Sequence, residues 1–458
     1  MQHADHSPTL KQHFWFGRWI DDQQLDAELA LPPGSRPGAL ATRLDERLQR
    51  PFPFESLTAA CASLSRELAA QGPAWEQLYE SVRNGIAASE AEAMLDALTV
   101  MLQPDQLQAK LRGELGTMRP GVLERRYPGR QYEAWMPAGC VVHVMPTNVL
   151  LVGALGLLES LLAGNLNIVK LSGRDTAFAA LFAQALARHD PSDSLSGYMA
   201  VLRLASSRQA ALRTLFRHAD VISAWGGETA VAAVRKLAPP QAKLVVWGHK
   251  VSFGYLAAEC LDDEQALEGF ARDVCRLDQQ ACSSPQTLLV EAEGEALERV
   301  AERLAAALGR VSPGIPAQAP DMAEQAELTT VLCVARAEQA LGLARVIEAP
   351  DHAWRVMVDH RAGLKPSPLF RTIWVKPVQR DQLGPSLRPM RPWLQTCGLA
   401  CALPSVAALS RMLLASGVTR IARPGEMTDS YGGAPHDGVY ALQQLTRRVS
   451  VDGPATLE

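Results

Sequence analysis

Cys282 is the residue whose surroundings best suit covalent chemistry. It lies in the polar segment 278–285, Asp-Gln-Gln-Ala-Cys-Ser-Ser-Pro, whereas the other cysteines mostly lie in apolar runs. A thiolate can attack an activated acyl carbon and carry the acyl group as a thioester, provided that its environment favours the charged form. A helix ending just before Cys282 would oppose the thiolate, so activation must come from cofactor charge, backbone hydrogens or a spatial neighbour.

Asn148 and Lys170 are polar residues at the ends of two apolar segments. An amide at a strand-to-helix junction, where Asn148 lies, can stabilise a developing oxyanion. A helix N-cap is the structural alternative for Asn148. A strand that ends in Lys170 would place an ammonium group at the carboxyl edge of a sheet, where a nucleotide ribose or phosphate binds. An exposed strand end is the alternative for Lys170.

Two adjacent glycines, Gly226 and Gly227, follow the apolar segment 221–225 and precede Glu228 and Thr229. Backbone N–H groups at the start of the next helix can bind a pyrophosphate, and glycine permits its close approach. A plain strand-to-helix turn would have the same sequence. The chain contains none of the common motifs GxGxxG, GxxxxGK[ST] and GxSxG.

Composition and charge exclude several classes of protein. Of the 458 residues, 47% are hydrophobic and 21% are charged, and the formal net charge is −4. A nucleic-acid backbone requires a clustered positive surface, so nucleic acid is not an expected partner. The longest apolar stretch, 149–169, contains Glu159 and two asparagines. It predicts a buried helix and turn rather than a membrane span.

The N-terminal residues contain no secretory signal, so we expect a cytoplasmic protein with reduced thiols. The eight cysteines show no paired metal-ligand spacing, and Cys397 and Cys401 have no histidine nearby in the sequence. We therefore predict no metal site.

The elements that must position these residues alternate between helices and strands. Segments 57–69 and 89–101 are typical of amphipathic helices, and from 132 to 247 short apolar segments alternate with helical ones. This alternation predicts βαβ units and a parallel sheet covered on both faces. We expect an extended segment at 132–144 and strands at 167–171, 199–204, 221–225 and 243–247. In a second α/β stretch, 264–401, we expect helices at 264–276 and 295–308 and strands at 287–291, 329–335 and 372–377.

From about residue 125 onward, the order and spacing of these segments resemble the aldehyde dehydrogenase superfamily. The elements PWN, KPSE, the glycine turn and GQxC correspond to Pro146-Thr147-Asn148, Lys170-Leu171-Ser172-Gly173, Gly226-Gly227 and Gln280-Ala281-Cys282. The resemblance implies an α/β fold with a parallel-sheet cofactor domain, an α/β catalytic domain and a small extended oligomerisation arm. It also implies that the cofactor is bound by Lys170, Ser172, Gly226, Gly227 and Thr229.

Within that superfamily, the chain resembles the fatty acyl-CoA reductases of bacterial bioluminescence, the LuxC family. The resemblance rests on segments 247–254, 278–285 and 416–420 and on His436-Asp437-Gly438. It implies reduction of an activated fatty acyl group, from acyl-CoA or an acyl adenylate, to the aldehyde with NADPH. It also implies an acyl-protein synthetase as a candidate partner and, through the arm near 132–144, a homo-oligomer.

The resemblance implies that Cys282 takes up the acyl group and that the Asn148 amide and the Cys282 backbone N–H hold the oxyanion. Val246 stands where hydrolytic relatives carry the glutamate of ELGGK, which activates water. Because valine cannot take a proton, the thioester should survive to meet hydride. His249, at a position that is glycine in most relatives, either acts near the cofactor or makes a structural hydrogen bond.

Two further departures from the superfamily pattern concern the cofactor. Gly173 and Arg174 stand where KPSE has its glutamate. Losing a carboxylate that would repel a 2′-phosphate, and gaining a cation, favours NADPH over NADH. Of the EIFGP element, the segment 367–370 retains only Phe370. We therefore expect Phe370 at the cofactor, and the nicotinamide-ribose contact stays unassigned.

We expect a helical N-terminal region and an NADP(H)-binding domain in residues 1–250, with an arm strand near 125–144. Residues 251–405 form the expected catalytic domain, and 406–458 the segment that returns to the cofactor domain or arm. One alternative is a CoA-acylating dehydrogenase that acts on other aldehydes, and another is a non-catalytic scaffold subunit of an acyl-transfer complex. A third is a glutamyl-phosphate-reductase-like enzyme, which the C-terminal segment disfavours.

Overall fold

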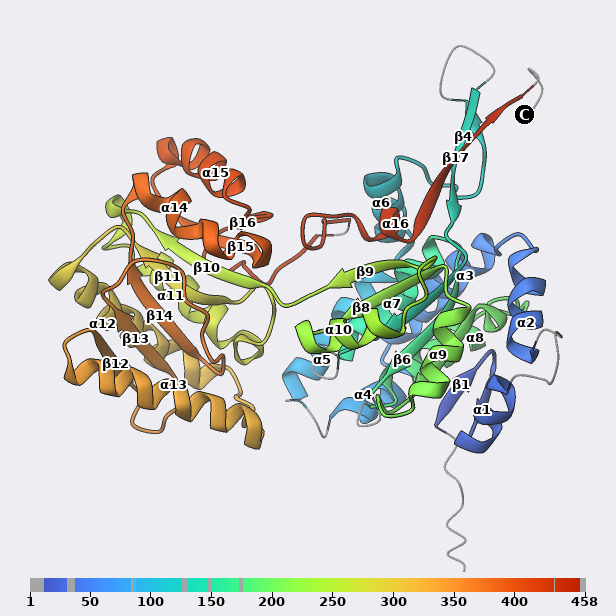
Figure 1. Ribbon diagram of the computed structural model, residues 1–458, viewed down its shortest axis with the longest axis horizontal. Helices are drawn as coiled ribbons and strands as arrows, with labels where there is room; N and C mark the ends of the chain where they lie inside the picture. The colour runs from blue at the N-terminus through green and yellow to red at the C-terminus, as the bar shows by residue number, and fades with distance from the viewer. Residues whose placement is uncertain are drawn as a thin grey trace, which may run out of the picture. The chain divides into compact units, whose positions relative to one another are not determined.

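The computed structural model describes residues 12–30, 38–83, 86, 88–125, 131–146, 150–172, 176–431 and 433–453. The chain forms two compact units (Figure 1). The first unit comprises Met1–Gly248 and Tyr431–Glu458, and the second comprises His249–Ser430.

The first unit is built on a seven-stranded sheet with the strand order β2-β1-β7-β6-β5-β8-β9. The strands from β5 to β9 pair in parallel, as predicted, and β1 pairs antiparallel with β7 and β2. The strands are β1 (His13–Trp15), β2 (Arg18–Ile20), β5 (Cys140–Val144), β6 (Leu166–Leu171), β7 (Met199–Arg203), β8 (Val221–Trp225) and β9 (Lys243–Trp247). All carboxyl ends of the parallel strands therefore lie at one edge of the sheet.

Helices connect the parallel strands, and further helices lie between β2 and β5 in the chain. The connecting helices are α7 (Leu150–Leu162), α8 (Phe178–Arg188), α9 (Gln209–Arg217) and α10 (Glu228–Leu237). The helices between β2 and β5 are α1 (Asp22–Leu29), α2 (Ala39–Leu48), α3 (Phe54–Ala69), α4 (Pro73–Val82), α5 (Ala88–Met101) and α6 (Pro104–Leu115).

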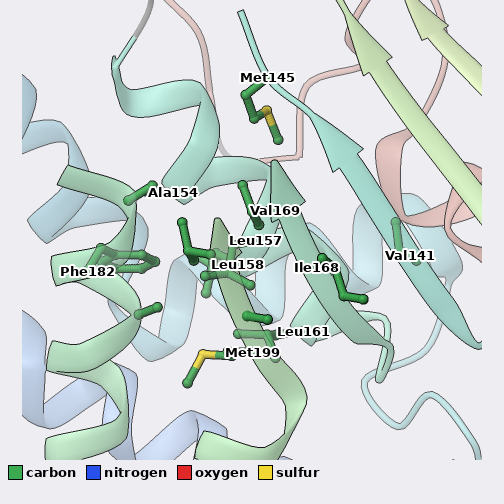
Figure 2. Packing of buried hydrophobic residues seen from close by; sticks show 14 of the residues in the cluster. Val141, Met145, Ala154, Leu157, Leu158, Leu161, Ile168, Val169, Phe182 and Met199 are labelled. Atoms are coloured by element: carbon green, nitrogen blue, oxygen red, sulfur yellow. The ribbon is translucent and has the colours of Figure 1, made fainter. Parts of the chain in front are cut away.

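Helix α7 occupies the longest apolar stretch of the chain. Its residues Leu157, Leu158 and Leu161 belong to the same buried cluster as Val169 of β6 and Phe182 of α8 (Figure 2). The prediction of a buried helix is therefore confirmed. Among the described residues, no helix combines the length and the apolar character needed to cross a membrane.

The extended segment expected at 132–144 is two strands that belong to different sheets. β4 (Gln131–Pro137) pairs antiparallel with β3 (Glu124–Arg125) and with β17 (Thr446–Asp452), which follows the short helix α16 (Ala441–Gln444). The break lies at Gly139, whose φ is +132°. A Cβ there would collide with the carboxylate of Asp220, which accepts a hydrogen bond from the Cys140 N–H (2.8 Å).

The second unit is built on another seven-stranded sheet, with the order β12-β13-β14-β11-β10-β15-β16. All neighbouring strands are parallel except β12 and β13. The strands are β10 (Val251–Leu256), β11 (Pro285–Val290), β12 (Ala344–Glu348), β13 (Arg355–Asp359), β14 (Thr372–Pro377), β15 (Leu394–Ala400) and β16 (Arg420–Ala422).

Helices cover both faces of this second sheet. They are α11 (Glu264–Cys275), α12 (Gly294–Val311), α13 (Met322–Ala340), α14 (Leu383–Leu387) and α15 (Val406–Ala415). Successive strand residues point to opposite faces. Leu288 and Val290 thus pack in the cluster of α11 and α12, whereas Leu289 packs in the cluster that contains Leu409 and Leu413.

The prediction of a strand at 329–335 was wrong, because these residues lie inside α13. Adjacent threonines and valines in this segment are typical of strands. A capping box between Asp321 and Glu324 nevertheless starts a helix here. The residues Leu328, Leu332 and Ala335 recur at helical spacing and pack against β13 and β14.

Candidate active site

Cys282 lies in the turn that precedes β11, and its side chain is exposed. Its Sγ accepts a hydrogen bond from the amide of Gln395 on β15, with an Nε2–Sγ distance of 3.2 Å. Its carbonyl oxygen accepts a hydrogen bond from Ser252 Oγ on β10, at 2.7 Å. Because Ser252 and Gln395 are buried, the turn is fixed to the sheet while the thiol stays accessible.

The backbone just before Cys282 is left-handed at three consecutive residues. Leu277, Asp278 and Gln279 have φ values of 50°, 47° and 66°. Each such non-glycine residue costs on the order of 1–3 kcal/mol and persists only where surrounding contacts over-determine it. Helix α11 accordingly ends at Cys275, and strained backbone links it to the turn of Cys282.

A buried ion pair holds this strained segment in place. Arg371 Nε lies 2.7 Å from Asp278 Oδ1, and the two side chains are 2% and 3% exposed. The same guanidinium donates to the carbonyl oxygens of Ile315 (3.0 Å) and Pro316 (2.7 Å). The other carboxylate oxygen of Asp278 accepts the Gln318 N–H at 2.8 Å. A charge buried this deeply is stable only with its partners present.

Arg371 belongs to a second left-handed run, with Leu369, Phe370 and Arg371 at φ values of 62°, 49° and 57°. The Phe370 N–H donates to the Asp278 carbonyl at 3.0 Å. The Gln279 side chain accepts the Thr372 N–H at 3.0 Å. The structure therefore joins the segment of Phe370 to the segment that carries Cys282.

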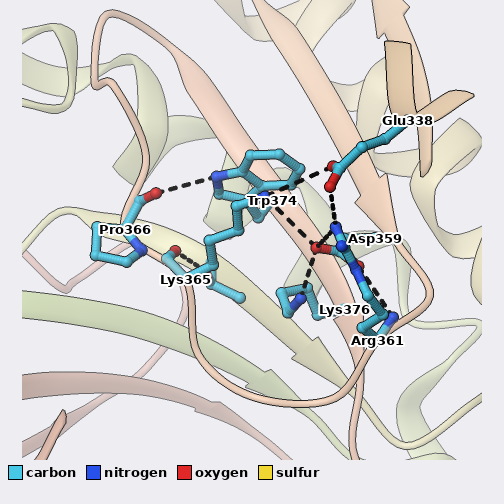
Figure 3. Close-up of polar contacts among 8 residues, drawn as sticks. Glu338, Asp359, Arg361, Lys365, Pro366, Trp374 and Lys376 are labelled. Carbon is cyan, nitrogen blue, oxygen red and sulfur yellow. Dashed lines mark hydrogen bonds and ion pairs between the residues drawn. The ribbon is translucent and has the colours of Figure 1, made fainter. Parts of the chain in front are cut away.

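A polar cluster fixes the chain between β13 and β14, which leads to Phe370 (Figure 3). Asp359 contacts Lys376 Nζ at 2.9 Å and Arg361 Nε at 2.8 Å. Lys365 Nζ lies 3.6 Å from the ring centroid of Trp374. A cation over an aromatic face and a nearly buried ion pair both resist displacement of this segment.

Acid should weaken this cluster in a defined pH window. Burial alone would raise the pKa of Asp359, but hydrogen bonds from Arg361 and Lys376 outweigh it and hold that pKa well below its usual value. Because the pKa of Asp359 is lower in the folded state than in the unfolded state, the carboxylate stabilises the fold at pH values above its unfolded pKa of about 3.9. This stabilisation is lost as the pH falls through the pKa of the folded state. We therefore expect the advantage of the wild type over Asp359→Asn in urea unfolding to shrink between about pH 4 and pH 2. A pH-independent difference between the two proteins would contradict this assignment, and Asp351→Asn, an exposed aspartate, is the control.

In the first unit, a cavity of about 810 Å³ lies at the carboxyl ends of the parallel strands. Lys170, near the end of β6, and Thr229, in the first turn of α10, both line it. Apolar side chains of α9 and α10 form its walls: Leu212, Phe216, Ala230, Ala233, Val234 and Leu237. Arg213 and Lys236 add two further cations, and Glu228 is the one acidic residue among those that line it. Apolar walls with a few convergent polar groups are typical of sites for small molecules and cofactors.

The glycine turn beside this cavity has the expected form. Gly226 has a φ of +138°, which favours glycine, and Gly227 is the N-cap of α10. A Cβ at Gly227 would meet no atom within 4 Å, so the helix start is open to close approach.

An aromatic cluster lies at the same strand ends. Trp225 and Trp247 stack with their ring centroids 5.2 Å apart, and the His436 ring lies 5.1 Å from Trp225. Trp225 Nε1 is buried and has no hydrogen-bond partner in the part of the chain that the structure describes. A donor, stacked rings and the open helix start fit a cofactor with planar rings and phosphates.

The structure brings the predicted residues together in two groups. Lys170 and Thr229 line one cavity, and Cys282 and Phe370 lie on joined segments. Ser172 directly follows β6, and His249 is exposed after β9. Val246, the residue in place of the ELGGK glutamate, is an exposed position of β9. Asn148 and Arg174 lie outside the described residues.

Sequence reasoning missed Gln395, Ser252 and Arg371. Gln395 lies 113 residues from Cys282 in the chain, and Arg371 lies 93 residues from Asp278. No local pattern marks either residue as a partner of the turn that carries Cys282. The departure of the segment 367–370 from its superfamily pattern, next to Arg371, was the only nearby signal.

Known proteins resemble this chain in sequence. The model of the family described as acyl-CoA reductase (LuxC) matches residues 74–448. A long-chain acyl-protein thioester reductase of Photorhabdus luminescens is 29% identical over 376 residues, which cover 80% of this chain and 75% of that protein. The corresponding protein of Aliivibrio fischeri is 29% identical over 346 residues, 74% of this chain and 69% of that protein.

Solved structures resemble it in fold. An NAD-dependent benzaldehyde dehydrogenase from Corynebacterium glutamicum superposes with a TM-score of 0.71 at 15% identity, covering 98% of each chain. PnpE from Pseudomonas sp. WBC-3 superposes with a TM-score of 0.70 at 14% identity, covering 98% of this chain and 99% of that one. These likenesses confirm the predicted aldehyde dehydrogenase-like fold.

Proposed function

The chain belongs to the acyl-CoA reductase (LuxC) family, and from this premise we propose that it reduces a fatty acyl thioester to the aldehyde with NADPH, through an acyl group carried on Cys282. The observation that carries the proposal is an exposed thiol on a turn fixed by buried contacts, with an amide donor 3.2 Å from its sulfur. An accessible sulfur can reach a substrate, and a donated hydrogen bond favours the thiolate that attacks.

The donor of the acyl group is proposed to be acyl-CoA, an acyl adenylate or an acylated protein. The names of the Photorhabdus and Aliivibrio relatives specify an acyl-protein thioester. In each case the Cys282 thiolate attacks the acyl carbon, a new S–C bond forms, and the donor's leaving group departs with the electron pair of the broken bond. An acyl-protein synthetase is accordingly a proposed partner.

The thioester on Cys282 must be protected from water if it is to be reduced. We assign this protection to Val246, which replaces the acid–base glutamate of hydrolytic relatives and cannot take a proton. The oxyanion that forms on the carbonyl oxygen when hydride adds to the acyl carbon is proposed to be held by the Asn148 amide and the Cys282 backbone N–H. His249 stays a proposed neighbour of the cofactor.

The cavity of the first unit is the proposed site of the adenosine half of the cofactor. The apolar faces of α9 and α10 fit an adenine ring, Lys170 fits the ribose, and the helix start at Gly227 fits the phosphates. The lining cations Lys170, Arg213 and Lys236 favour a cofactor with an additional phosphate. When bound, NADPH supplies the hydride that reduces the acyl carbon.

Lys170→Ala should weaken NADPH binding by about 10- to 100-fold, because it removes a charge-assisted hydrogen bond worth about 1.5–3 kcal/mol. Titration of NADPH fluorescence measures the dissociation constant without any turnover. Lys243→Ala is the control, because Lys243 begins β9 and contacts the Gln444 carbonyl at the opposite edge of the sheet. Equal affinities of the Lys170 variant and the wild type would exclude this site.

The two directions of thioester chemistry separate this proposal from a CoA-acylating dehydrogenase. We expect NADPH oxidation and aldehyde formation with long-chain acyl-CoA to be faster than reduction of NADP⁺ with short aldehydes plus CoA. The reverse order would favour the dehydrogenase. A scaffold subunit would oxidise no NADPH with any acyl donor.

A further inference from the structure

Strand β15 is irregular next to the nucleophile. Two of its residues, Gln395 and Thr396, take the place opposite a single residue of β10, Ser252, because the register shifts between Val251 and Phe253. The pairing of β10 with β11 shifts at the same residue, Ser252. Bulges of this kind redirect a side chain and are common beside active sites. Here Gln395 lies at the irregularity, and its amide contacts the sulfur of Cys282.

Buried contacts hold Gln395 in this position. The backbone carbonyl oxygen of Gln395 accepts hydrogen bonds from both the N–H (2.9 Å) and the Oγ1 (3.2 Å) of Thr419. Ser252 Oγ accepts the Thr396 N–H at 3.1 Å and donates to the Cys282 carbonyl at 2.7 Å. The Ser252 hydroxyl therefore links β15, which carries Gln395, to the turn that carries Cys282. Only 5% of Gln395 is exposed, so water does not compete freely with this contact.

We propose that Gln395 is a catalytic residue that donates a hydrogen bond to the sulfur of Cys282 whenever that sulfur carries negative charge. The inference rests on the proposed function and adds to it a donor on the reacting atom. An amide is suited to this task because it stabilises a thiolate while keeping its own proton and adding no net charge.

Sulfur carries that charge at two points of the reaction. Before acyl transfer, the Cys282 thiolate uses an electron pair to form the S–C bond, and the donor's leaving group takes the pair from the bond that breaks. At aldehyde release, the alkoxide reforms its C=O bond, the C–S bond breaks, and its electron pair returns to Cys282. The Gln395 amide, 3.2 Å from Sγ, is placed to stabilise the thiolate in both steps.

A purely structural amide would be an expensive choice at this place. A buried polar group costs free energy unless it is hydrogen-bonded, and an apolar side chain of similar size avoids that cost. The oxygen of the Gln395 amide lies 3.5 Å from both Ser252 Oγ and Thr396 Oγ1. The contact of its nitrogen with sulfur is the shorter one and the one with chemical use.

The test is the pH dependence of Cys282 alkylation in the full-length protein, with iodoacetamide as the probe and peptide mass spectrometry as the readout. In Gln395→Leu we expect the midpoint of the pH–rate profile to rise by about one to two pH units, and the rate at neutral pH to fall about tenfold or more. Gln395→Glu keeps the size of the side chain and brings a carboxylate to the sulfur, so its shift should be larger. Cys333, exposed on α13, is the internal reference in every sample.

Gln286→Leu is the matched control. Gln286 is also buried, but its amide donates to the Lys250 carbonyl (3.3 Å) and accepts the Ser367 N–H (3.2 Å) instead of contacting the sulfur. We expect this variant to keep the wild-type midpoint even if it unfolds more easily. If Gln395 had only a structural role, Gln395→Leu and Gln286→Leu would have the same midpoint of the pH–rate profile.

The inference is overturned if Gln395→Leu and Gln395→Glu both keep the wild-type midpoint and the wild-type rate of acyl-enzyme formation from acyl-CoA. If Gln395→Leu does not fold, Gln395→Glu alone decides. A wild-type protein that acyl-CoA never acylates would refute the proposed function instead, and the alkylation profiles would still report on the donor.

Discussion

Cys282→Ala is expected to form no covalent acyl adduct and to lose aldehyde formation by at least about 10³-fold. In the proposed cycle the sulfur accepts the acyl group and is the atom from which the aldehyde departs, so no other group of the site can complete either step. Incubation with a radiolabelled long-chain acyl-CoA, followed by gel autoradiography, measures the adduct. Gas chromatography measures the aldehyde.

The control for this prediction is Cys333→Ala, which removes the other exposed cysteine among the described residues. Because Cys333 lies within α13, away from the turn before β11, its variant should keep both label and aldehyde. Label or aldehyde that persists in Cys282→Ala would refute the assignment of the nucleophile. A fall in NADPH affinity alone would not count as support.

Arg371→Met is expected to lower the free energy of unfolding by about 3–5 kcal/mol, because it leaves the buried carboxylate of Asp278 without its cation. This is a large share of the roughly 5–15 kcal/mol that stabilises a typical domain. The variant also removes the contact that holds the left-handed residues before Cys282 to those around Phe370, so acyl transfer should slow as well. Urea unfolding measures the first effect, and the rate of Cys282 acylation measures the second.

An exposed arginine provides the comparison. Arg345 forms ion pairs with Glu298 and Glu302, but its side chain is 41% exposed. Exposed pairs contribute about 1 kcal/mol or less, so Arg345→Met should change stability by no more than that. If Arg371→Met is as stable as Arg345→Met, the buried ion pair does not hold the turn that carries Cys282.

Much of the fold was predictable because it depends on local patterns. The apolar segments 221–225 and 243–247 are short and bounded by helical segments, and they form β8 and β9 as expected. The segment 329–335 misled because its β-branched residues are typical of strands, whereas α13 is set by its N-terminal cap and by leucines at helical spacing. The break at Gly139 depends on Asp220, a contact far along the chain.

In the candidate site, too, features that depend on local sequence were predictable and contacts between distant segments were not. The positions of Cys282, Lys170 and the glycine turn were predictable, because each lies where a strand or helix begins or ends, and their chemical roles stay predictions. Gln395 was not predictable, because its contact with Cys282 follows from the adjacency of β15, β10 and β11 in the sheet. Strand order is set by packing over the whole unit, so partners of this kind become visible only in three dimensions.

The central claim is that Cys282 is loaded with an acyl group and unloaded by reduction, and mass spectrometry of the intact protein tests it most directly. The protein is incubated with a long-chain acyl-CoA, and NADPH is then added to half of the sample. We expect the mass to rise by one acyl group without NADPH and to return to its starting value with NADPH while the aldehyde appears. A wild-type protein that gains no mass, or one that loses the acyl group only as free fatty acid, would contradict the claim.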